Sequence, residues 1–190
     1  MINSELGHVK TLSEFYESIR SQQEEAHGEH YCKMHDVVAN FAKECKSYKE
    51  LGVHQGGTLA NALLQPTLKY VEGIDVSMEK YEKFLKPIAE EYAKDEKKVL
   101  KMKEVDSTGI DALGYATDIL VIDSYHKAFH MQKELERHGP YVKKYIVAHD
   151  THKPDDQLYW CLANWAADNN WKVLMRNQEN VGFTVLKKNA

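Results

Sequence analysis

The feature that most constrains the fold is an alternation that begins near residue 48. From there, short apolar runs are separated by longer segments with helical periodicity. The most apolar run, residues 118–123, contains Ile-Leu-Val-Ile, which is typical of a central strand buried on both faces of a sheet. Strands that alternate with helices predict an α/β fold, with a parallel sheet and helices on both of its faces.

The pattern predicts specific elements after residue 47. We expect five parallel strands, at residues 48–53, 70–76, 99–105, 118–123 and 145–148, the third of them at a sheet edge because charged residues interrupt it. We expect helices at residues 58–68, 77–94, 128–138 and 155–170. Ser77 is the predicted cap of the second helix, Pro87 should kink or divide it, and Gly139-Pro140 should end the third.

A terminal hairpin departs from this parallel pattern. Residues 171–175 and 181–186 read as two strands joined by a turn, which adds one antiparallel strand to the sheet. A nicotinamide-binding Rossmann domain does not predict that hairpin. The chain therefore divides into an α/β domain at residues 48–190 and a helical segment at residues 1–47.

The N-terminal segment has two stretches of helical spacing, at residues 5–25 and 33–47. His27, His30 and His35 cluster around the break between them. The spacing of these histidines is loose for a metal site. We expect this segment to act as a lid that folds over the site and contacts substrate.

Composition excludes several function classes. The formal net charge of -4 argues against a nucleic-acid partner bound through bulk charge, although it leaves room for a local basic patch. No apolar run is long enough to cross a membrane, and the N-terminus lacks the layout of a signal peptide. Three widely spaced cysteines form no disulfide framework, so we expect a reducing, cytoplasmic setting.

The first chemical signal is a glycine-containing turn between a predicted strand and helix. Glu50, Gly52 and Gly56 stand in the spacing Glu-x-Gly-x-x-x-Gly. Glycines at such a turn let the backbone approach a ligand, and the helix N-terminus offers free N–H groups. The spacing differs from both the dinucleotide fingerprint and the phosphate-binding P-loop. An ordinary strand-to-helix turn is the alternative interpretation.

Asp75 ends the second predicted strand and is the second signal. An acidic side chain at this place can accept hydrogen bonds from both hydroxyls of a ribose. The alternative is a helix-capping aspartate. Together, the glycine turn and this acid favour a ligand that contains adenosine.

Two further segments follow the fourth and fifth predicted strands. Asp123 and His126 come after the fourth, and His149 and Asp150 after the fifth. The carboxyl ends of parallel strands share one edge, so we expect these side chains to meet there. Carboxylate and imidazole ligands suit a divalent cation such as Mg²⁺. Helix capping and polar gating are the alternatives.

These segments together resemble the class I S-adenosylmethionine-dependent methyltransferases. The chain is most similar to the small-molecule O-methyltransferase branch that includes cephalosporin-hydroxylase-like and macrocin O-methyltransferase-like proteins, over about residues 48–188. The resemblance implies that Glu50, Gly52 and Gly56 line the methionine end of S-adenosylmethionine, and that Asp75 holds the ribose.

The resemblance also implies roles for residues after the later strands. Asp106 and Ser107 would lie by the adenine, Asp123 would border the cofactor, and Asp123 and Asp150 would bind the metal in a metal-dependent enzyme. This chain departs from the branch in having Ser124 in place of a glycine. It also has Thr151 where several metal-dependent relatives carry a second acid or an amide.

The resemblance predicts methyl transfer from S-adenosylmethionine to an oxygen of a small molecule. A divalent metal would lower the pKa of the acceptor hydroxyl; without a metal, His126 or His149 would act as the base. Other chemistry on the same fold and a non-catalytic nucleotide-binding protein are the alternatives. We expect a small-molecule acceptor and a homodimer, and we expect no nucleic-acid or membrane partner.

Overall fold

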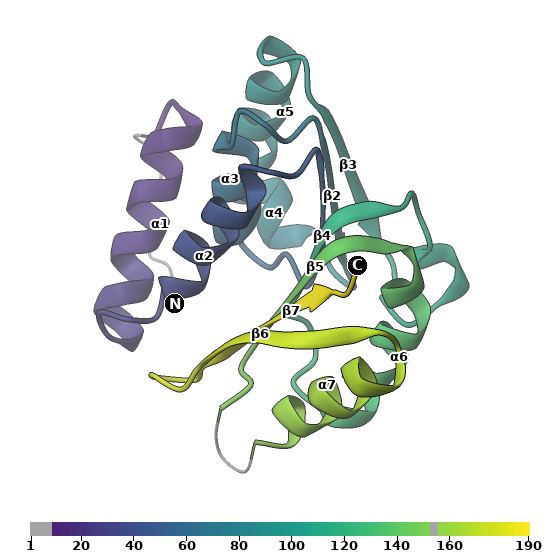
Figure 1. The fold of residues 1–190 in the computed structure, drawn as a ribbon. Helices are drawn as coiled ribbons and strands as arrows, with labels where there is room; N and C mark the ends of the chain where they lie inside the picture. Colours follow the sequence, from purple (N-terminus) through teal and green to yellow (C-terminus); the bar gives the residue numbers. More distant parts are fainter. Residues whose placement is uncertain (1–8, 153–155) are drawn as a thin grey trace.

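The computed structural model describes residues 9–152 and 156–190. Its centre is a seven-stranded sheet in the order β3-β2-β1-β4-β5-β7-β6 (Figure 1). The strands are β1 (Ser47–Leu51), β2 (Tyr70–Asp75), β3 (Val99–Glu104), β4 (Thr117–Ile122), β5 (Val142–His149), β6 (Trp171–Asn177) and β7 (Phe183–Lys188). All neighbours pair in parallel except β7, which is antiparallel to both β5 and β6. The predicted mostly parallel sheet with a terminal hairpin is confirmed.

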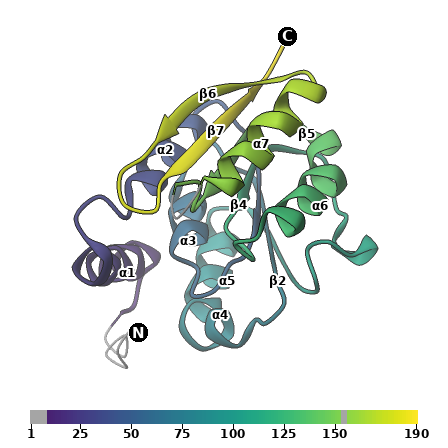
Figure 2. The ribbon, with the colours of Figure 1, turned by 90° about the horizontal axis from the view of Figure 1, so that it is seen from below.

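Helices cover both faces of the sheet (Figures 1 and 2). One face carries α1 (Leu12–His27), α2 (Lys33–Ala42), α3 (Gly57–Leu64), α4 (Glu79–Phe84) and α5 (Lys86–Asp95). The other carries α6 (Ala128–His138) and α7 (Gln157–Asp168). No helix within the described ranges has the length and apolar character needed to cross a bilayer.

The central strand divides the core into two halves. Ile119 and Val121 of β4 point into the cluster on one face, and Leu120 and Ile122 point into the cluster on the other. Successive side chains of a strand alternate between the faces of a sheet, so only an unbroken apolar run can serve both. All six residues of β4 are buried, as the sequence predicts.

The N-terminal helices pack onto the α/β domain. Thr11 caps α1, since its side chain accepts from the Glu14 N–H while the Glu14 carboxylate accepts from the Thr11 N–H. Phe15 and Ile19 of α1 are fully buried against α3 in the same cluster that holds β4. The predicted lid therefore shares a core with the sheet, and its role over the site stays a prediction.

Two local expectations are wrong in detail. Ser77 does not cap a helix, because α4 begins at Glu79 and its N-cap, Met78, makes no side-chain capping bond. The second N-terminal helix ends at Ala42 rather than at residue 47, where β1 begins. The predicted division near Pro87 is confirmed, since α5 begins at Lys86 with the proline in its first turn, where no N–H is required.

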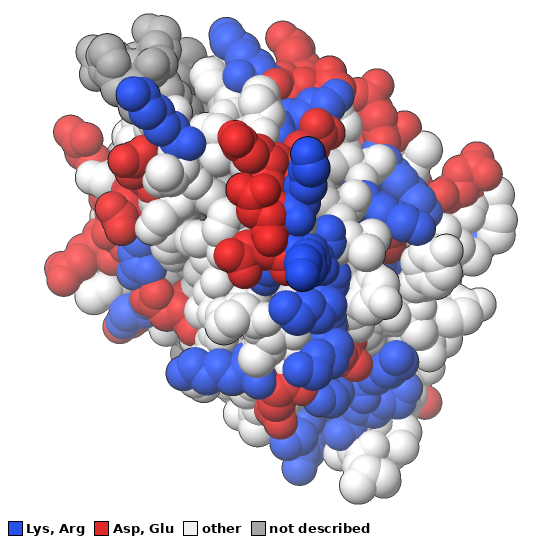
Figure 3. All heavy atoms as spheres, turned by 90° about the horizontal axis from the view of Figure 1, so that it is seen from above, with Lys and Arg blue, Asp and Glu red and all other residues white. Residues whose placement is uncertain are grey.

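The two edges of the sheet differ in character. The carboxyl ends of the parallel strands carry glycines, acids and histidines. The amino ends carry lysines, which form a band across the face shown in Figure 3.

A buried histidine predicts acid sensitivity. His35 of α2 is 4% exposed, its Nε2 lies 3.1 Å from Thr58 Oγ1, and burial lowers its pKa to about 4. In the unfolded chain the His35 imidazole is protonated below about pH 6.5, whereas in the folded chain it is protonated only below about pH 4. The stability from neutral His35 is therefore complete above pH 6.5 and is lost as the pH falls.

The measurement is urea unfolding of the parent and of His35→Gln at pH 7 and pH 5. Between pH 7 and pH 5, the free energy of unfolding of the parent should fall by about 2 kcal/mol more than that of the variant. His30→Gln, an exposed histidine near the same helix, is the control for loss of an imidazole. Equal losses in the parent and His35→Gln would contradict the assignment.

Candidate functional site

A cavity of about 460 Å³ opens at the carboxyl edge of the sheet. Residues that follow β1, β2, β3, β4 and β5 all contribute to its wall. Gln23 of α1 and Tyr31, between α1 and α2, complete the lining from the N-terminal segment. The cavity therefore lies where ligands gather in open parallel sheets, and the predicted lid borders it.

The glycine turn forms one wall. Gly52 has φ +87° and Gly56 has φ +84°, a backbone region that L side chains rarely adopt. A Cβ on Gly52 would lie 2.1 Å from the carbonyl oxygen of Asp123, so the turn packs directly on the chain after β4. Helix α3 starts after Gly56 without a side-chain cap. Its first N–H groups can therefore receive polar ligand groups.

Glu50 borders this turn at the base of the cavity. Its side chain is almost completely buried and accepts a hydrogen bond of 2.6 Å from the Tyr48 hydroxyl. Burial raises the pKa of Glu50 well above its ordinary value. A buried carboxyl with raised proton affinity is a feature of ligand-binding and catalytic sites.

Asp75 lines the cavity and also holds the glycine turn in place. Its Oδ2 accepts from the backbone N–H groups of Val53 and His54, both at 2.8 Å, and its Oδ1 accepts from Ser77 N–H at 3.1 Å. Part of the role of Asp75 is therefore structural, because its carboxylate fixes the backbone of the glycine turn. A carboxylate accepts about four hydrogen bonds, so one position remains for a ligand hydroxyl.

Of the two residues predicted to lie by the adenine, only one lines the cavity. Ser107 lines the cavity, whereas Asp106 lies outside the lining, with its carboxylate 2.8 Å from both the N–H and the hydroxyl of Thr108. Ser107 and Ser124 both donate to the fully buried Glu134, at 2.5 and 2.6 Å. These two hydroxyls therefore present acceptor lone pairs toward the cavity.

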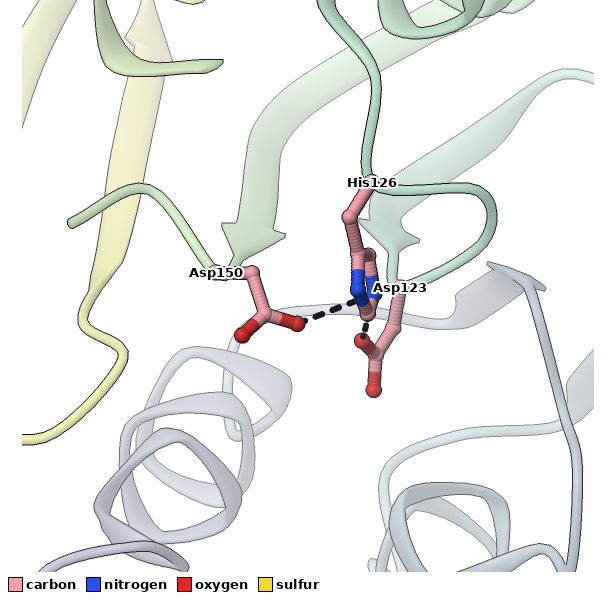
Figure 4. Close-up of side chains that lie close together, drawn as sticks. All are labelled: Asp123, His126 and Asp150. Carbon is pink, nitrogen blue, oxygen red and sulfur yellow. Dashed lines mark hydrogen bonds and ion pairs between the residues drawn. The ribbon is translucent and has the colours of Figure 1, made fainter. Parts of the chain in front are cut away.

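Asp123 and Asp150 contact two imidazoles, those of His126 and His149, and Figure 4 shows His126 between the two acids. His126 Nε2 lies 2.9 Å from Asp150 Oδ2 and 3.4 Å from Asp123 Oδ1. His149 Nδ1 contacts the same two oxygens, at 3.2 and 3.1 Å. The sequence expectation that these four side chains converge is confirmed, although His149 is buried behind the acids and does not line the cavity.

The cluster is electrostatically balanced. Hydrogen bonds to Asp123 and Asp150 raise the pKa of His126 to about 9. Burial opposes the charged form of His149, yet the two acids more than reverse this and raise its pKa to about 10. The histidines in turn hold the pKa values of both aspartates below the ordinary value, against the opposing effect of burial. Two carboxylates are thus neutralised by two imidazolium groups.

The same donors could hold a divalent cation. Asp123, His126 and Asp150 each offer one ligand atom, and these atoms lie within 4.8 Å of one another. Two oxygen ligands and one nitrogen ligand fit Mg²⁺ or Mn²⁺, and a divalent charge would replace the two protons that balance the acids. The residues present therefore fit the metal that the resemblance implies.

Several lining residues were missed from the sequence. Tyr31 lies edge-on to His149, with ring centroids 5.5 Å apart, and His130 Nε2 lies 3.2 Å from Ser107 Oγ. His130 stands four positions after His126, but α6 begins at Ala128, so only His130 lies on the helix and the spacing does not reflect a shared helix face. His35 was expected on the lid, but it is buried against α3 because it shares an inward face with Val38.

Comparisons with known proteins agree with this architecture. No protein family model matches the chain, and no curated protein matches it in sequence. An O-methyltransferase family protein from Burkholderia thailandensis superposes with a TM-score of 0.66 at 13% identity, over 98% of this chain and 62% of its own. This chain thus spans less than two thirds of that protein.

Two further solved structures have the same fold. Ribosomal protein L11 methylase from Lactobacillus delbrueckii subsp. bulgaricus has a TM-score of 0.62 at 13% identity, covering 85% of this chain and 81% of its own. TrmK from M. capricolum, in complex with S-adenosyl-homocysteine, has a TM-score of 0.57 at 10% identity, covering 81% and 66%. The chain therefore has the fold of the class I S-adenosylmethionine-dependent methyltransferases.

Proposed function

We propose that this protein transfers a methyl group from S-adenosylmethionine to an oxygen of a small molecule, with a divalent cation at the acidic cluster. One observation carries the proposal: a single cavity joins the glycine turn, Asp75 and the group of Asp123, His126 and Asp150. The first two suit an adenosine-containing ligand, and the third suits activation of a hydroxyl group.

The residues of the chain would position the two reactants and would not need to activate the methyl group. When bound, S-adenosylmethionine supplies a methyl group that its sulfonium already activates. The N-terminus of α3, Glu50 and Asp75 line the cavity on the side of the glycine turn, and Ser107 and Ser124 line it after β3 and β4. Such fixed contacts hold two reactants in line, which is the main source of acceleration in this chemistry.

The acidic cluster would prepare the acceptor oxygen. Asp123, His126 and Asp150 would hold the cation, whose charge lowers the pKa of a bound hydroxyl. His126 is half-exposed in the cavity, but its pKa of about 9 keeps it protonated at neutral pH, so without a metal it would take the acceptor proton only after losing its own. His149 is a positioning residue, because it is buried behind both acids.

The acceptor would enter beside the N-terminal segment. Tyr31 and Gln23 of that segment border the cavity. The 460 Å³ volume suits one cofactor and a small group of a second molecule.

The functional test follows labelled methyl groups. The protein is incubated with methyl-labelled S-adenosylmethionine, a panel of hydroxylated small molecules and Mg²⁺, and label is counted in the small-molecule, protein and nucleic-acid fractions. The proposal expects label in the small-molecule fraction and a loss of transfer when the metal is chelated. Label confined to protein or nucleic acid would contradict it.

A binding prediction concerns Asp75. We expect Asp75→Asn to weaken S-adenosylhomocysteine binding at least tenfold in calorimetry, because a charge-assisted hydrogen bond contributes about 1.5–3 kcal/mol. Asp111→Asn, an exposed aspartate in the connection between β3 and β4, is the control and should bind as the parent does. Equal affinity in parent and Asp75→Asn would remove Asp75 from the cofactor site.

A further inference from the structure

The amino edge of the sheet, opposite the cavity, gathers lysines from nearly every strand. Lysines immediately precede β1, β2 and β3, and others lie in the first residues of β5 and β6 and the last residues of β7, which runs the other way. They are Lys46, Lys69, Lys98, Lys143, Lys144, Lys172, Lys187 and Lys188. They contribute to the basic band of Figure 3, in a chain whose formal net charge is -4.

A groove of about 740 Å³ runs through this edge. Five lysines line it: Lys46, Lys49, Lys101, Lys143 and Lys144. Its wall is formed by the first residues of β1, β2, β3 and β5 and by residues 115–118, which lead into β4. No lysine precedes β4, so the groove lies between basic strand ends.

The acids of the groove are already paired within the protein. Glu72 is almost completely buried, 2.9 Å from Lys49 Nζ and 3.2 Å from Lys103 Nζ. The Asp118 carboxylate accepts from the backbone N–H groups of Lys46 and Ser47, at 2.7 and 3.2 Å.

Exposed lysines of the groove, by contrast, carry positive charge that no acidic side chain balances. Within the described ranges, Lys46, Lys101 and Lys143 have no carboxylate partner. All three line the groove and are exposed. The groove therefore carries a net positive field that the chain itself leaves unbalanced.

Two tyrosine rings accompany these charges. Tyr70 is 59% exposed and Tyr115 is 73% exposed, and both line the groove. Lys101 Nζ lies 4.3 Å from the centre of the Tyr115 ring, which holds one ring face next to a cation. Exposed aromatic rings set among lysines provide stacking surfaces for bases beside contacts for phosphates.

We propose that this lysine groove binds single-stranded nucleic acid. Lysines on neighbouring strand ends would contact successive phosphates, and Tyr70 and Tyr115 would stack on bases. Strands lie about 4.8 Å apart, so the row from β3 to β6 extends over roughly 29 Å, enough for several nucleotides. The concave form and the rings favour nucleic acid over a lipid surface or an acidic peptide, which offer no bases to stack.

The groove and the cavity lie at opposite ends of the strands. Nucleic acid held here would not present its bases to Asp123 and Asp150, so the groove anchors the protein rather than feeding the reaction. The inference therefore stands independently of the proposed methyl transfer. It also differs from the expectation of no nucleic-acid partner, which rests on the net charge of the whole chain. That net charge averages a basic sheet edge with acidic helices.

The test is fluorescence anisotropy with a labelled ten-nucleotide poly(U) RNA at several salt concentrations. The parent is compared with Lys46→Gln/Lys101→Gln/Lys143→Gln. The control, Lys10→Gln/Lys83→Gln/Lys133→Gln, removes the same charge from exposed positions elsewhere. We expect the groove variant to bind at least tenfold more weakly and the control to stay within twofold. The salt slope should fall by about 2, since each single-strand phosphate contact contributes about 0.7.

A second variant and a second probe separate nucleic acid from polyanions in general. Tyr115→Ala should weaken RNA binding severalfold while leaving heparin binding unchanged, because heparin has no bases. Retained S-adenosylhomocysteine affinity or an unchanged circular dichroism spectrum verifies that the variants fold. Equal losses in both triple variants, no RNA binding by the parent at low salt, or identical behaviour of Tyr115→Ala and parent toward RNA would each overturn the proposal.

Discussion

Gly52→Ala should destabilise the protein by more than about 4 kcal/mol, in the range that marks exceptional substitutions. Two effects combine at this position. The added Cβ would lie 2.1 Å from the carbonyl oxygen of Asp123, and backbone atoms cannot give way as a flexible side chain does. The φ of +87° adds strain of about 1–2 kcal/mol.

A matched control separates the two effects. Gly28 has φ +103°, but the nearest atom to its added Cβ, Asn180 Nδ2, is 3.8 Å away. Gly28→Ala should therefore lose only the strain, about 1–3 kcal/mol, because φ +103° with ψ +156° is a region that essentially only glycine adopts. Both are measured by urea unfolding, with cofactor affinity alongside. If Gly52→Ala lost no more stability than Gly28→Ala, the packing of the glycine turn on the chain after β4 would be wrong.

Asp150→Asn should abolish or strongly weaken divalent metal binding. Asp150 supplies one of two carboxylates in the cluster, and Asn carries no charge. Asp150 has φ +54°, which Asn tolerates better than most residues, so the backbone should keep its conformation. We expect Mn²⁺ affinity, measured by electron paramagnetic resonance, to fall at least tenfold, with S-adenosylhomocysteine affinity within threefold of the parent.

Asp156→Asn is the control for this substitution. Asp156 also has a left-handed backbone, φ +57°, and pairs with His152, but it lies outside the cavity. It should bind Mn²⁺ as the parent does. If the parent bound no Mn²⁺ at millimolar concentration, the metal proposal would fail.

Much of the fold is readable from the sequence because strand burial leaves a strong pattern. The unbroken apolar run before Asp123 predicts the central strand, and the charged residues in β3 predict an edge strand. Both are confirmed. The glycine turn and the convergence of Asp123 with Asp150 follow from the geometry of parallel sheets, since side chains after adjacent strands share one edge.

Loop conformation and long-range polar contacts are not readable in this way. Asp106 and Ser107 are neighbours in sequence, yet one turns to Thr108 and the other faces the cavity. The burial of Glu134 depends on hydroxyls from two separate loops. The lysine row was present in the sequence, directly before the strands, but its meaning needs strand order and direction. Cytoplasmic location and homodimer formation stay predictions.

Hydrogen exchange with and without S-adenosylhomocysteine tests the central claim, that the carboxyl-edge cavity is a cofactor site. At saturating ligand, peptides covering residues 50–58, 75–78 and 105–108 should exchange more slowly, because these segments line the cavity or support its wall. Strand starts at residues 99–101 and 142–144, on the opposite edge, should be unchanged. No protection at millimolar ligand, or protection confined to the lysine edge, would contradict the account.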